Sequence, residues 1–265
     1  MPRTPLAHAE THSHIFGAID TAVTPFPDTQ RQRDQVQALL DTTLQTALCA
    51  ESFGTGAQVS VIIDDAAAGH SFPSGAAQDR RVWIELIAYS GTNVVYQSGI
   101  VADNQAVTSS TDPDLWLMRD CMFDQSGAQV HMFWEAASFE TNALPALTTF
   151  TPSDPNFYQT HKMRFFPASG TAITPAPDRM TLRVRLSAVG LDVLDDLIAS
   201  GDLDPQFRTS IPPVTVGGTL EWTRAAATHT YIDRNTNALV YCVTNSNLNV
   251  QADKFAASVR TKCAP

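Results

Sequence analysis

Short runs in which apolar and polar side chains alternate constrain the fold of this chain more than any other feature. Eight runs rich in β-branched or aromatic residues follow Gln58, at 59–64, 82–89, 94–98, 130–135, 162–166, 180–187, 219–223 and 238–244. A period of two is typical of strands with one buried face. Turn-rich connections, with too few helices for βαβ units, favour antiparallel pairing. We therefore predict a mainly β fold, an antiparallel two-sheet sandwich of the immunoglobulin-like or jelly-roll-like kind.

Two helices are expected beside the strands. From an N-cap at Asp28, apolar residues recur at spacings of three and four as far as Leu48, and the glycines at 54 and 56 end the pattern. Residues 191–200 form a second, short amphipathic pattern closed by Gly201. Residues 1–27 show no sustained period and are predicted to be irregular. We divide the chain into 1–56, a His-containing segment plus helix, and 57–265, the sandwich.

Composition excludes several classes of protein. The chain has 265 residues, 43% of them hydrophobic, which is enough for a large core. Lys and Arg number 17 against 27 Asp and Glu, so the net charge of −10 disfavours binding to nucleic acid or anionic lipid. No apolar run approaches the ~20 residues of a membrane helix, and the first residues contain no apolar stretch of a signal peptide. Taken alone, these features predict a cytosolic protein.

The four cysteines, Cys49, Cys121, Cys242 and Cys263, contain no CxxC pair. This spacing excludes a zinc ribbon, thioredoxin chemistry and covalent haem attachment through CxxCH within the chain. The preferred disulfide joins Cys242 to Cys263, because both lie in a polar C-terminal segment that could otherwise fray. Four buried, reduced thiols are the alternative.

Histidines are the leading candidates for chemistry, because the sequence contains no GxSxG, P-loop, GxGxxG or HExxH motif. His8, His12 and His14 lie close together near the start. Imidazole is the usual neutral nitrogen ligand of zinc, copper and haem iron, so the cluster is a ligand candidate. On an extended segment, the side chains of His12 and His14 would point to one face. A solvated histidine-rich end without function is the alternative.

A second candidate, His70, lies in AAAGHSFPSGAAQDRRVWIEL, residues 66–86, where Pro73 and Gly75 predict a turn. In the functional interpretation, His70 and an arginine, Arg80 or Arg81, face an anionic or metal-bearing partner. In the structural interpretation, His70 bonds the turn backbone and one of the arginines pairs with a nearby aspartate. The candidate aspartates are Asp64, Asp65 and Asp79.

The remaining polar residues indicate structure more than catalysis. His131 alternates with apolar residues and is predicted to be a hydrogen-bonded core imidazole. Asp195 and Asp196 predict a solvated helix face, whereas Asp64 and Asp65 end a strand where calcium or a turn would suit them equally. No Ser–His–acid order stands out. The residues alone give no support for catalysis, and we expect no enzyme.

Residues 68–99, which contain AGHSFPSG, QDRRVWIELIAY and VVYQSG, resemble the non-haem C-terminal domain of bacterial multihaem c-type cytochromes. In that family a GHxFPTG-like turn leads into a strand with Arg and Trp, and the next strand ends in Ser-Gly; Ser74 stands where Thr is usual. THSHIFGAID, residues 11–20, is similar to the HSHxFxG segment that follows the last haem motif there. Because MPR commonly follows CxxCH in the family, the resemblance implies that Met1 is an internal methionine.

The resemblance implies a non-catalytic accessory domain that packs on a haem module, with Arg80, Arg81 and Trp83 at the interface. This chain lacks CxxCH, so any haem c is held by an adjacent segment or chain. By position, His14 and then His12 are the candidate distal ligands that would complete bis-His iron for electron transfer. The expected partner is a haem-bearing cytochrome module or a redox partner protein, without nucleic acid or membrane insertion. Since haem c is attached outside the cytoplasm, the resemblance replaces the cytosolic location with the periplasm or cell surface.

Two alternatives come from other functional classes. One is a metalloenzyme that holds copper or zinc through His8, His12, His14 or His70. The other is a stand-alone sandwich that binds glycan or protein through an exposed Trp116 or Trp134. Trp134 alternates with His131 and is predicted to be a core residue, which leaves Trp116 as the better candidate for a glycan.

Overall fold

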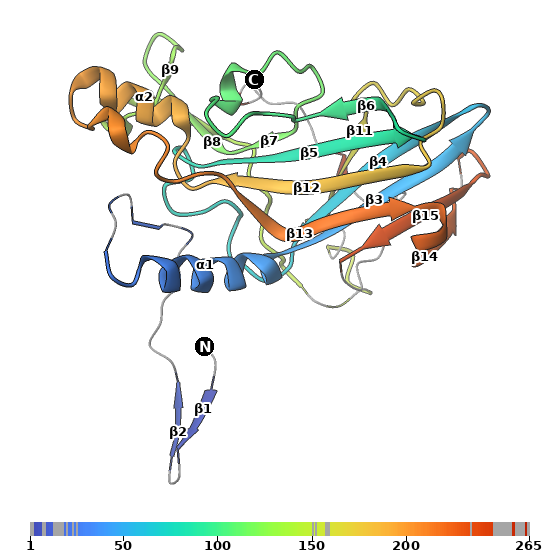
Figure 1. Cartoon of the computed structure of the whole chain (residues 1–265), viewed down its shortest axis with the longest axis horizontal. Coiled ribbons are helices and arrows are strands. Elements are labelled where there is room, and N and C mark those ends of the chain that lie inside the picture. The colour runs from blue at the N-terminus through green and yellow to red at the C-terminus, as the bar shows by residue number, and fades with distance from the viewer. Residues whose placement is uncertain are drawn as a thin grey trace.

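Two sheets, antiparallel apart from one edge pair, pack face to face in the computed structural model, which confirms the mainly β sandwich (Figure 1). The six-stranded sheet has the order β14 (His229–Ile232), β15 (Leu239–Thr244), β3 (Leu44–Phe53), β4 (Gly56–Asp65), β11 (Lys162–Phe166) and β16 (Ala256–Ala257). Only β11 and β16 pair in parallel among these strands. The five-stranded sheet runs β13 (Val214–Thr223), β12 (Arg179–Ser187), β5 (Arg81–Ser90) and β6 (Asn93–Ser98), with β7 (Leu117–Met118) also on β5.

Smaller elements complete the fold. The structure describes residues 3–6, 9–12, 19, 21–22, 24, 26–149, 151, 153–156, 160–233, 235–245, 256–257 and 263. A three-stranded sheet has the order β10 (Ser138–Thr141), β8 (Asp120–Phe123) and β9 (Gln129–Val130). Short 3-10 helices are η1 (Val107–Ser109), η2 (Phe133–Glu135), η4 (Pro205–Phe207) and η5 (Arg224–Ala226). Within the segment predicted to be irregular, β1 (Arg3–Leu6) and β2 (Ala9–His12) pair as a hairpin.

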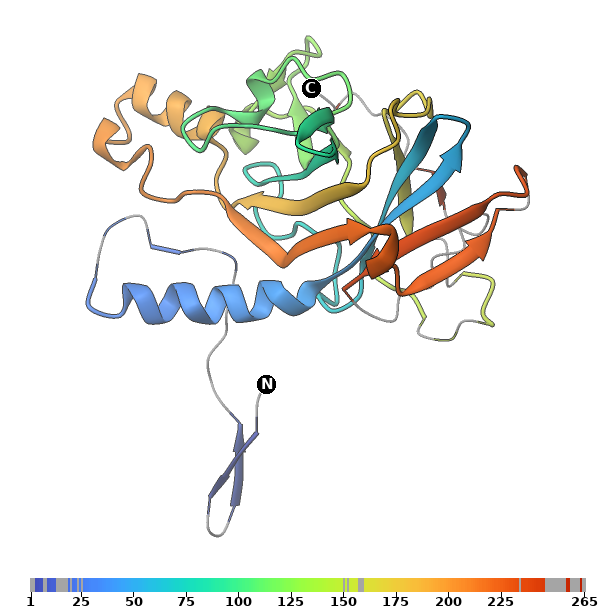
Figure 2. The same cartoon turned by 45° about the vertical axis from the view of Figure 1, so that its right-hand side comes forward.

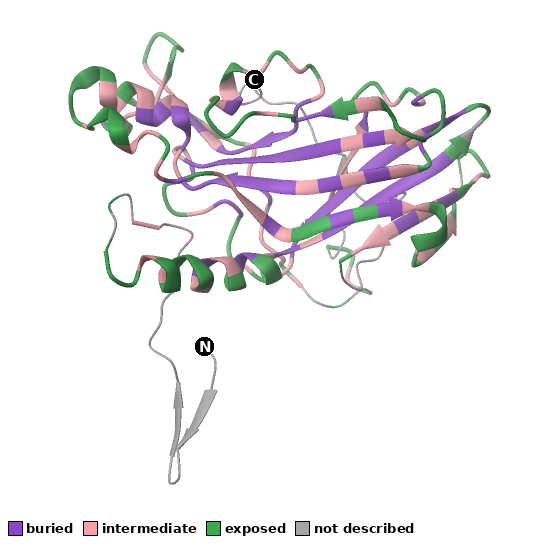
Figure 3. Cartoon of the chain, viewed as in Figure 1, coloured by how far each residue is buried: buried purple, intermediate pink, exposed green. Residues whose placement is uncertain are grey.

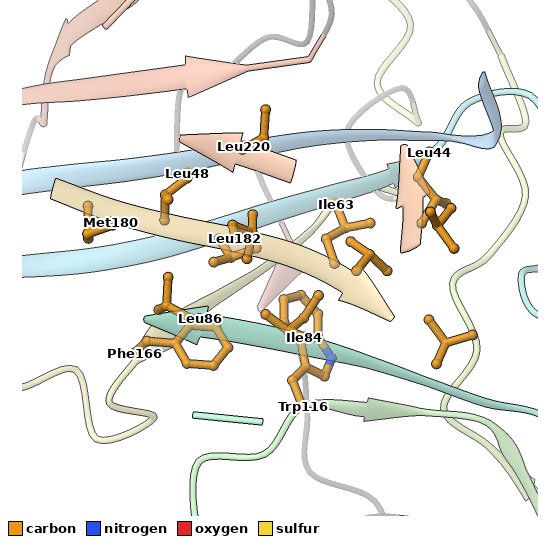
Figure 4. Packing of buried hydrophobic residues seen from close by; sticks show 14 of the residues in the cluster. Leu44, Leu48, Ile63, Ile84, Leu86, Trp116, Phe166, Met180, Leu182 and Leu220 are labelled. Carbon is orange, nitrogen blue, oxygen red and sulfur yellow. The ribbon is translucent and has the colours of Figure 1, made fainter. Parts of the chain in front are cut away.

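The core fills the space between the two large sheets, where buried residues run along both (Figure 3). Figure 4 shows Leu48 and Ile63 of the six-stranded sheet facing the side chains of the five-stranded sheet. Trp116 lies in this core, 2% exposed, with its ring centroid 6.4 Å from that of Phe166. The glycan hypothesis based on an exposed Trp116 is therefore wrong. Trp116 is buried because its backbone pairs with β5, where the Ile84 amide donates to the Trp116 carbonyl at 3.1 Å, and its indole lies in the core.

The N-terminal helix is shorter than predicted: α1 (Thr29–Thr43) ends where β3 begins at Leu44. The prediction of helix as far as Leu48 is wrong. Leu44 and Leu48 are four residues apart, and this spacing places two side chains on one face both in a helix, with a period of 3.6, and in a strand, with a period of two. Leu44 and Leu48 lie in the main core, whereas Ala47 lies on the opposite, also buried, face. Asp28 also makes no side-chain cap. The late helix, α2 (Leu191–Ser200), has its predicted bounds, and Gly201 ends it with φ +85°.

The predicted strand at 130–135 is also corrected. Only Gln129 and Val130 form a strand, and the chain then makes the η2 turn. Consequently Trp134, predicted as core, is 69% exposed. His131 is half-buried and bonds carboxylates rather than lying in the core.

The disulfides differ from the predicted pairing. Cys242 pairs with Cys49, and Cys263 with Cys121. The first bridge joins neighbours in register on β3 and β15, so a preference based on the C-terminal segment alone was wrong. No free cysteine occurs among the residues described. Two disulfides are typical of proteins that fold outside the cytoplasm.

We predict that Gly99→Ala destabilises the domain by more than roughly 3 kcal/mol. Gly99 has φ +70°, and an added Cβ would overlap the Ile84 carbonyl oxygen of the adjacent strand. Gly91→Ala is the matched control, because Gly91 has φ +60° but no atom within 4 Å of an added Cβ. Urea unfolding of both variants would measure the difference; equal losses would contradict the close-approach argument.

Candidate functional site

A cavity of about 470 Å³ lies beside the C-terminal half of α1. Its walls combine apolar and polar side chains and come from Ile19, from α1, from the loop after β4 and from the GHSFPSG turn. The lining residues are Ile19, Leu39, Leu40, Thr42, Thr43, Ala67, Ala68, His70, Phe72, Ser74, Gly75 and Arg80. Ile19 belongs to THSHIFGAID, and Ala68 to Gly75 belong to AGHSFPSG. The two segments that carry the family resemblance, about 50 residues apart in the sequence, therefore meet at one cavity.

Backbone hydrogen bonds hold the walls of this cavity. The Ala67 amide donates to the Thr43 carbonyl at the end of α1, at 3.2 Å. Phe72 exchanges two backbone hydrogen bonds with Leu144, at 2.9 and 2.7 Å. A second cavity of about 250 Å³, between α1 and the ends of β12 and β13, is also lined by Ile19. Ile19 therefore lines one cavity along the N-terminal half of α1 and another along its C-terminal half.

His70 is exposed on the cavity rim, and both of its ring nitrogens face the turn. Nδ1 lies 3.2 Å from the Ser71 carbonyl oxygen, and Nε2 lies 3.4 Å from Ser74 Oγ. These contacts agree with the structural interpretation of His70 as a residue that bonds its own turn. No group of three or more His, Cys, Asp or Glu residues suited to a metal occurs in the described part of the chain.

Among the described residues that line the cavity, Arg80 carries the one arginine or lysine side chain. The Arg80 side chain is 5% exposed; its Nε donates to the Ser74 carbonyl at 2.7 Å and its Nη1 to the Ala188 carbonyl at 3.2 Å. A buried guanidinium in an apolar wall favours an anionic group nearby. Backbone carbonyls of the GHSFPSG turn and of Ala188 thus hold the guanidinium in the cavity wall, where it contributes a positive charge.

The neighbouring Arg81 belongs to a different network. Its side chain is fully buried and pairs with Asp192 of α2, with Nη2 and Oδ2 2.7 Å apart. The sequence predicted Asp64, Asp65 or Asp79 as the carboxylate partner, whereas the hydrogen-bonded partner of Arg81 is Asp192. Trp83, 2% exposed, donates Nε1–H to the Gly99 carbonyl at 3.1 Å. Contact with a partner stays a prediction for Arg80, while Arg81 and Trp83 are held inside the domain.

His131 connects this network to the β9 end of the molecule. Its Nε2 lies 3.4 Å from Asp192 Oδ2, and its Nδ1 lies 2.5 Å from Asp196 Oδ2. The hydrogen bond to Asp192 raises the pKa of His131, which burial lowers and Asp196 raises further. Burial alone would raise the pKa of Asp192, but His131 and Arg81 together hold it well below its usual range. The solvated face expected at Asp195 and Asp196 agrees with their exposure, 44% and 57% of the side chains, and in addition Asp196 binds His131 and Asp195 binds Arg208.

Two adjacent carboxylates at the end of β4 are buried, with Asp64 2% and Asp65 1% exposed. Burial and the charge of Asp65 raise the pKa of Asp64 to about 7, against a hydrogen bond from Thr160. Burial raises the pKa of Asp65 to about 6, although the Ala68 amide and His70 lower it. Successive strand residues point to opposite faces, so these two carboxylates do not share a cation. Asp65 instead starts the AGHSFPSG turn by accepting the Ala68 amide at 3.1 Å.

The histidines of the N-terminal cluster are not brought into this site by the described residues. His8 and His14 lie outside the described residues, and of His12 only its place at the end of β2 is described. Sequence reasoning missed Ile19 and Leu39 as cavity residues and Asp192 as a charge partner. The sequence contained one indication of the cavity, because Leu39 is an apolar residue at the edge of the α1 stripe. In the structure Leu39 is 48% exposed. No helix in the described ranges is long and apolar enough to cross a membrane.

We predict that His131→Gln lowers the free energy of unfolding most between about pH 4 and 6.5, by roughly 1–3 kcal/mol. Because the pKa of His131 is raised in the folded state, protonated His131 stabilises the fold below about pH 6.5. This stabilisation is lost as the pH rises through the folded-state pKa. The lowered pKa of Asp192 means that its contribution is present above about pH 4 and lost on acidification.

Urea unfolding of both proteins across this pH range would measure the effect. His229→Gln is the control, because His229 lies in β14 and contacts the Thr228 hydroxyl instead of a carboxylate. A stability difference for His131→Gln that grows above about pH 8 would contradict the assignment.

Comparison with known proteins finds no matching family model and no matching curated protein. Among solved structures, the chain is similar to a penta-heme cytochrome c552 from Thermochromatium tepidum, with 16% sequence identity and a TM-score of 0.48. The match covers 71% of this chain and 41% of that chain, so the chain spans less than half the length of the cytochrome. At this level of similarity, the function proposed below rests on this chain's own residues.

Proposed function

We propose that this chain is a non-catalytic accessory domain associated with a multihaem c-type cytochrome. It packs on the haem-bearing module through the face that contains α1 and the GHSFPSG turn. The observation that carries this proposal is the cavity of about 470 Å³, where both sequence segments of the family resemblance meet. Ligand sites in proteins are commonly apolar clefts of about 300–1,000 Å³ with a few polar groups, and this cavity has that character.

Exposed apolar residues on α1 and just before it support a covered surface. Leu39, in the cavity wall, is 48% exposed, and Phe26, before the other end of the helix, is 41% exposed. A neighbouring module that covers α1 along its length would remove them from water. The domain would help to exclude water from the last haem of that module, which strengthens electrostatic interactions there.

The chain contributes no covalent haem site, because it has no CxxCH, so the haem c belongs to an adjacent segment or chain. The apolar residues in the cavity wall, Ile19, Leu39, Leu40 and Phe72, suit contact with the edge of such a group, and Arg80 adds a positive charge to the wall. His14 is five residues before Ile19, so its Cα lies within roughly 18 Å of the Ile19 Cα. We propose His14, and next His12, as the distal ligand; bis-His iron has no open position, which suits electron transfer.

The location follows from the same proposal. Two disulfides indicate an oxidising compartment. A domain that serves a c-type cytochrome works where haem c is attached, so we place it in the periplasm or at the cell surface.

The ligand proposal predicts a spectral change. Expressed together with a haem-bearing cytochrome module, the chain should give a low-spin bis-His spectrum. His14→Ala should convert one haem to a high-spin or differently ligated form, because removing an axial imidazole opens a coordination position. Absorption and electron paramagnetic resonance spectra of the purified protein would measure this.

His229→Ala, in β14, is the matched histidine control and should leave the spectrum unchanged. An unchanged spectrum in both His14→Ala and His12→Ala would remove the ligand role. An upstream reading frame without CxxCH codons would contradict the association with a haem-bearing segment of the same chain.

The packing proposal predicts that Leu39→Glu separates the domain from the haem module. A buried carboxylate at a docked face is costly, so the variant should speed limited proteolysis between the two parts by about ten-fold. Ile232→Glu is the control, because Ile232 is 59% exposed on β14 and lies away from the cavity. Equal cleavage rates in the two variants would contradict docking through α1.

A further inference from the structure

Three aromatic side chains form a second exposed apolar feature, remote in sequence from the cavity. Phe133, Trp134 and Phe139, here called the aromatic surface, are 71%, 69% and 72% exposed. They lie on η2 and on β10, within one short stretch. The other three tryptophans, Trp83, Trp116 and Trp222, are at most 4% exposed. Large aromatic side chains clustered in water are typical of interaction sites.

A small groove adjoins this surface. A cavity of about 260 Å³ is bounded by Phe139 on one side and by Met122 and two alanines below. Its lining residues are Gln78, Asp120, Met122, Ala136, Ala137, Ser138 and Phe139. The groove is large enough for one apolar side chain of a partner, and Phe139 forms its wall.

The backbone beneath the aromatic surface is firmly held. Phe139 pairs with Met122 across β10 and β8, and the Ala137 amide donates to the Phe123 carbonyl at 2.8 Å. The Cys121–Cys263 bridge fixes β8, and His131 bonds Asp196 of α2 just before η2. A surface held in place before binding loses less conformational entropy on association.

Apart from His131, the charged residues closest in sequence to the aromatic surface are acidic. Between Arg119 and Lys162 the sequence contains no lysine or arginine. Five carboxylates fall in the same stretch, at Asp120, Asp124, Glu135, Glu140 and Asp154. Arg119 itself is 3% exposed and donates inward to the Cys263 carbonyl and to Gln129. The surface therefore complements a partner with positive charge.

Two other occupants fit less well. The Phe133 and Trp134 rings are T-shaped, with centroids 5.0 Å apart and an interplanar angle of 77°. This pair has no continuous flat face on which a sugar ring could stack. A second copy of the chain would place acidic stretches opposite each other, which is repulsive for a protein of net charge −10.

We propose that the aromatic surface is a docking site for a second protein, which presents an apolar side chain surrounded by lysine or arginine. The apolar side chain enters the groove beside Phe139, and the basic residues face Glu135 and its neighbouring carboxylates. Figures 1 and 2 place β9 and α1 on opposite sides of β12 and β13. The groove and the cavity share no lining residue, although Gln78 of the groove lies between Gly75 and Arg80 of the cavity in the sequence.

Trp134 makes the proposal directly testable, because it is the exposed tryptophan of the four. The probes are three short synthetic peptides: one of lysine and leucine, one of glutamate and leucine, and one of lysine and serine. We expect the lysine–leucine peptide to bind the full chain and to shift the tryptophan emission to shorter wavelength. The other two peptides, which lack either the positive charge or the apolar side chains, should bind at least about ten-fold more weakly.

Variants locate the binding, measured by anisotropy of labelled lysine–leucine peptide. Trp134→Ala, Phe139→Ala and Glu135→Lys should each weaken it about ten-fold. Ile232→Ala, with 59% exposure on β14, should leave it unchanged. Binding that is indifferent to Trp134→Ala and Phe139→Ala would overturn the proposal. So would equal binding of all peptides, emission shifts with a cello-oligosaccharide, or dimerisation through this surface in sedimentation experiments.

Discussion

The two adjacent buried arginines at the start of β5 are the constraint on which the rest of the structure depends. Arg80 and Arg81 are 5% and 0% exposed, and as successive residues they point to opposite sides of the chain. A buried guanidinium is costly unless carbonyls or carboxylates satisfy it. Arg80 therefore requires the GHSFPSG turn, and Arg81 requires Asp192 and hence α2. One dipeptide thus positions the cavity on one side and the His131 network on the other.

Most of the residues that carry the family resemblance hold the domain together rather than face a partner. Trp83 bonds the Gly99 carbonyl, and Asp112 accepts hydrogen bonds from the Gly99 amide and the Ser98 hydroxyl, at 2.6 and 2.8 Å. A side chain at position 99 would overlap Ile84 of the adjacent strand. The Arg–Trp strand and the Ser-Gly end are therefore one packing unit. Of the motif residues that line the cavity, His70 and Arg80 carry the side chains that can be charged.

The strand pattern was predictable because alternate burial of side chains along a strand appears as alternate apolar residues in the sequence, as at Met180, Leu182 and Val184 of β12. The prediction failed at Leu44 and Leu48, because their spacing fits a helix and a strand equally. It also failed at Trp134, because a turn interrupts the run of apolar residues there. The disulfides depend on which strands become neighbours, and the pairing of Cys49 with Cys242 spans 193 residues. The cavity could not be predicted from the sequence for the same reason. Each motif was visible in the sequence, but their meeting at Ile19 and Phe72 is a property of the tertiary fold.

The two surfaces of this domain differ in the sign of their charge, and this difference decides what each can bind. The cavity beside α1 has Arg80 in its wall, which is the one arginine or lysine among its described lining residues. The aromatic surface has Glu135 in its sequence neighbourhood, and residues 120–161 contain no lysine or arginine. Charge complementarity therefore favours different groups at the two surfaces. The two proposals accordingly assign a haem module to the cavity face and a basic protein to the aromatic surface.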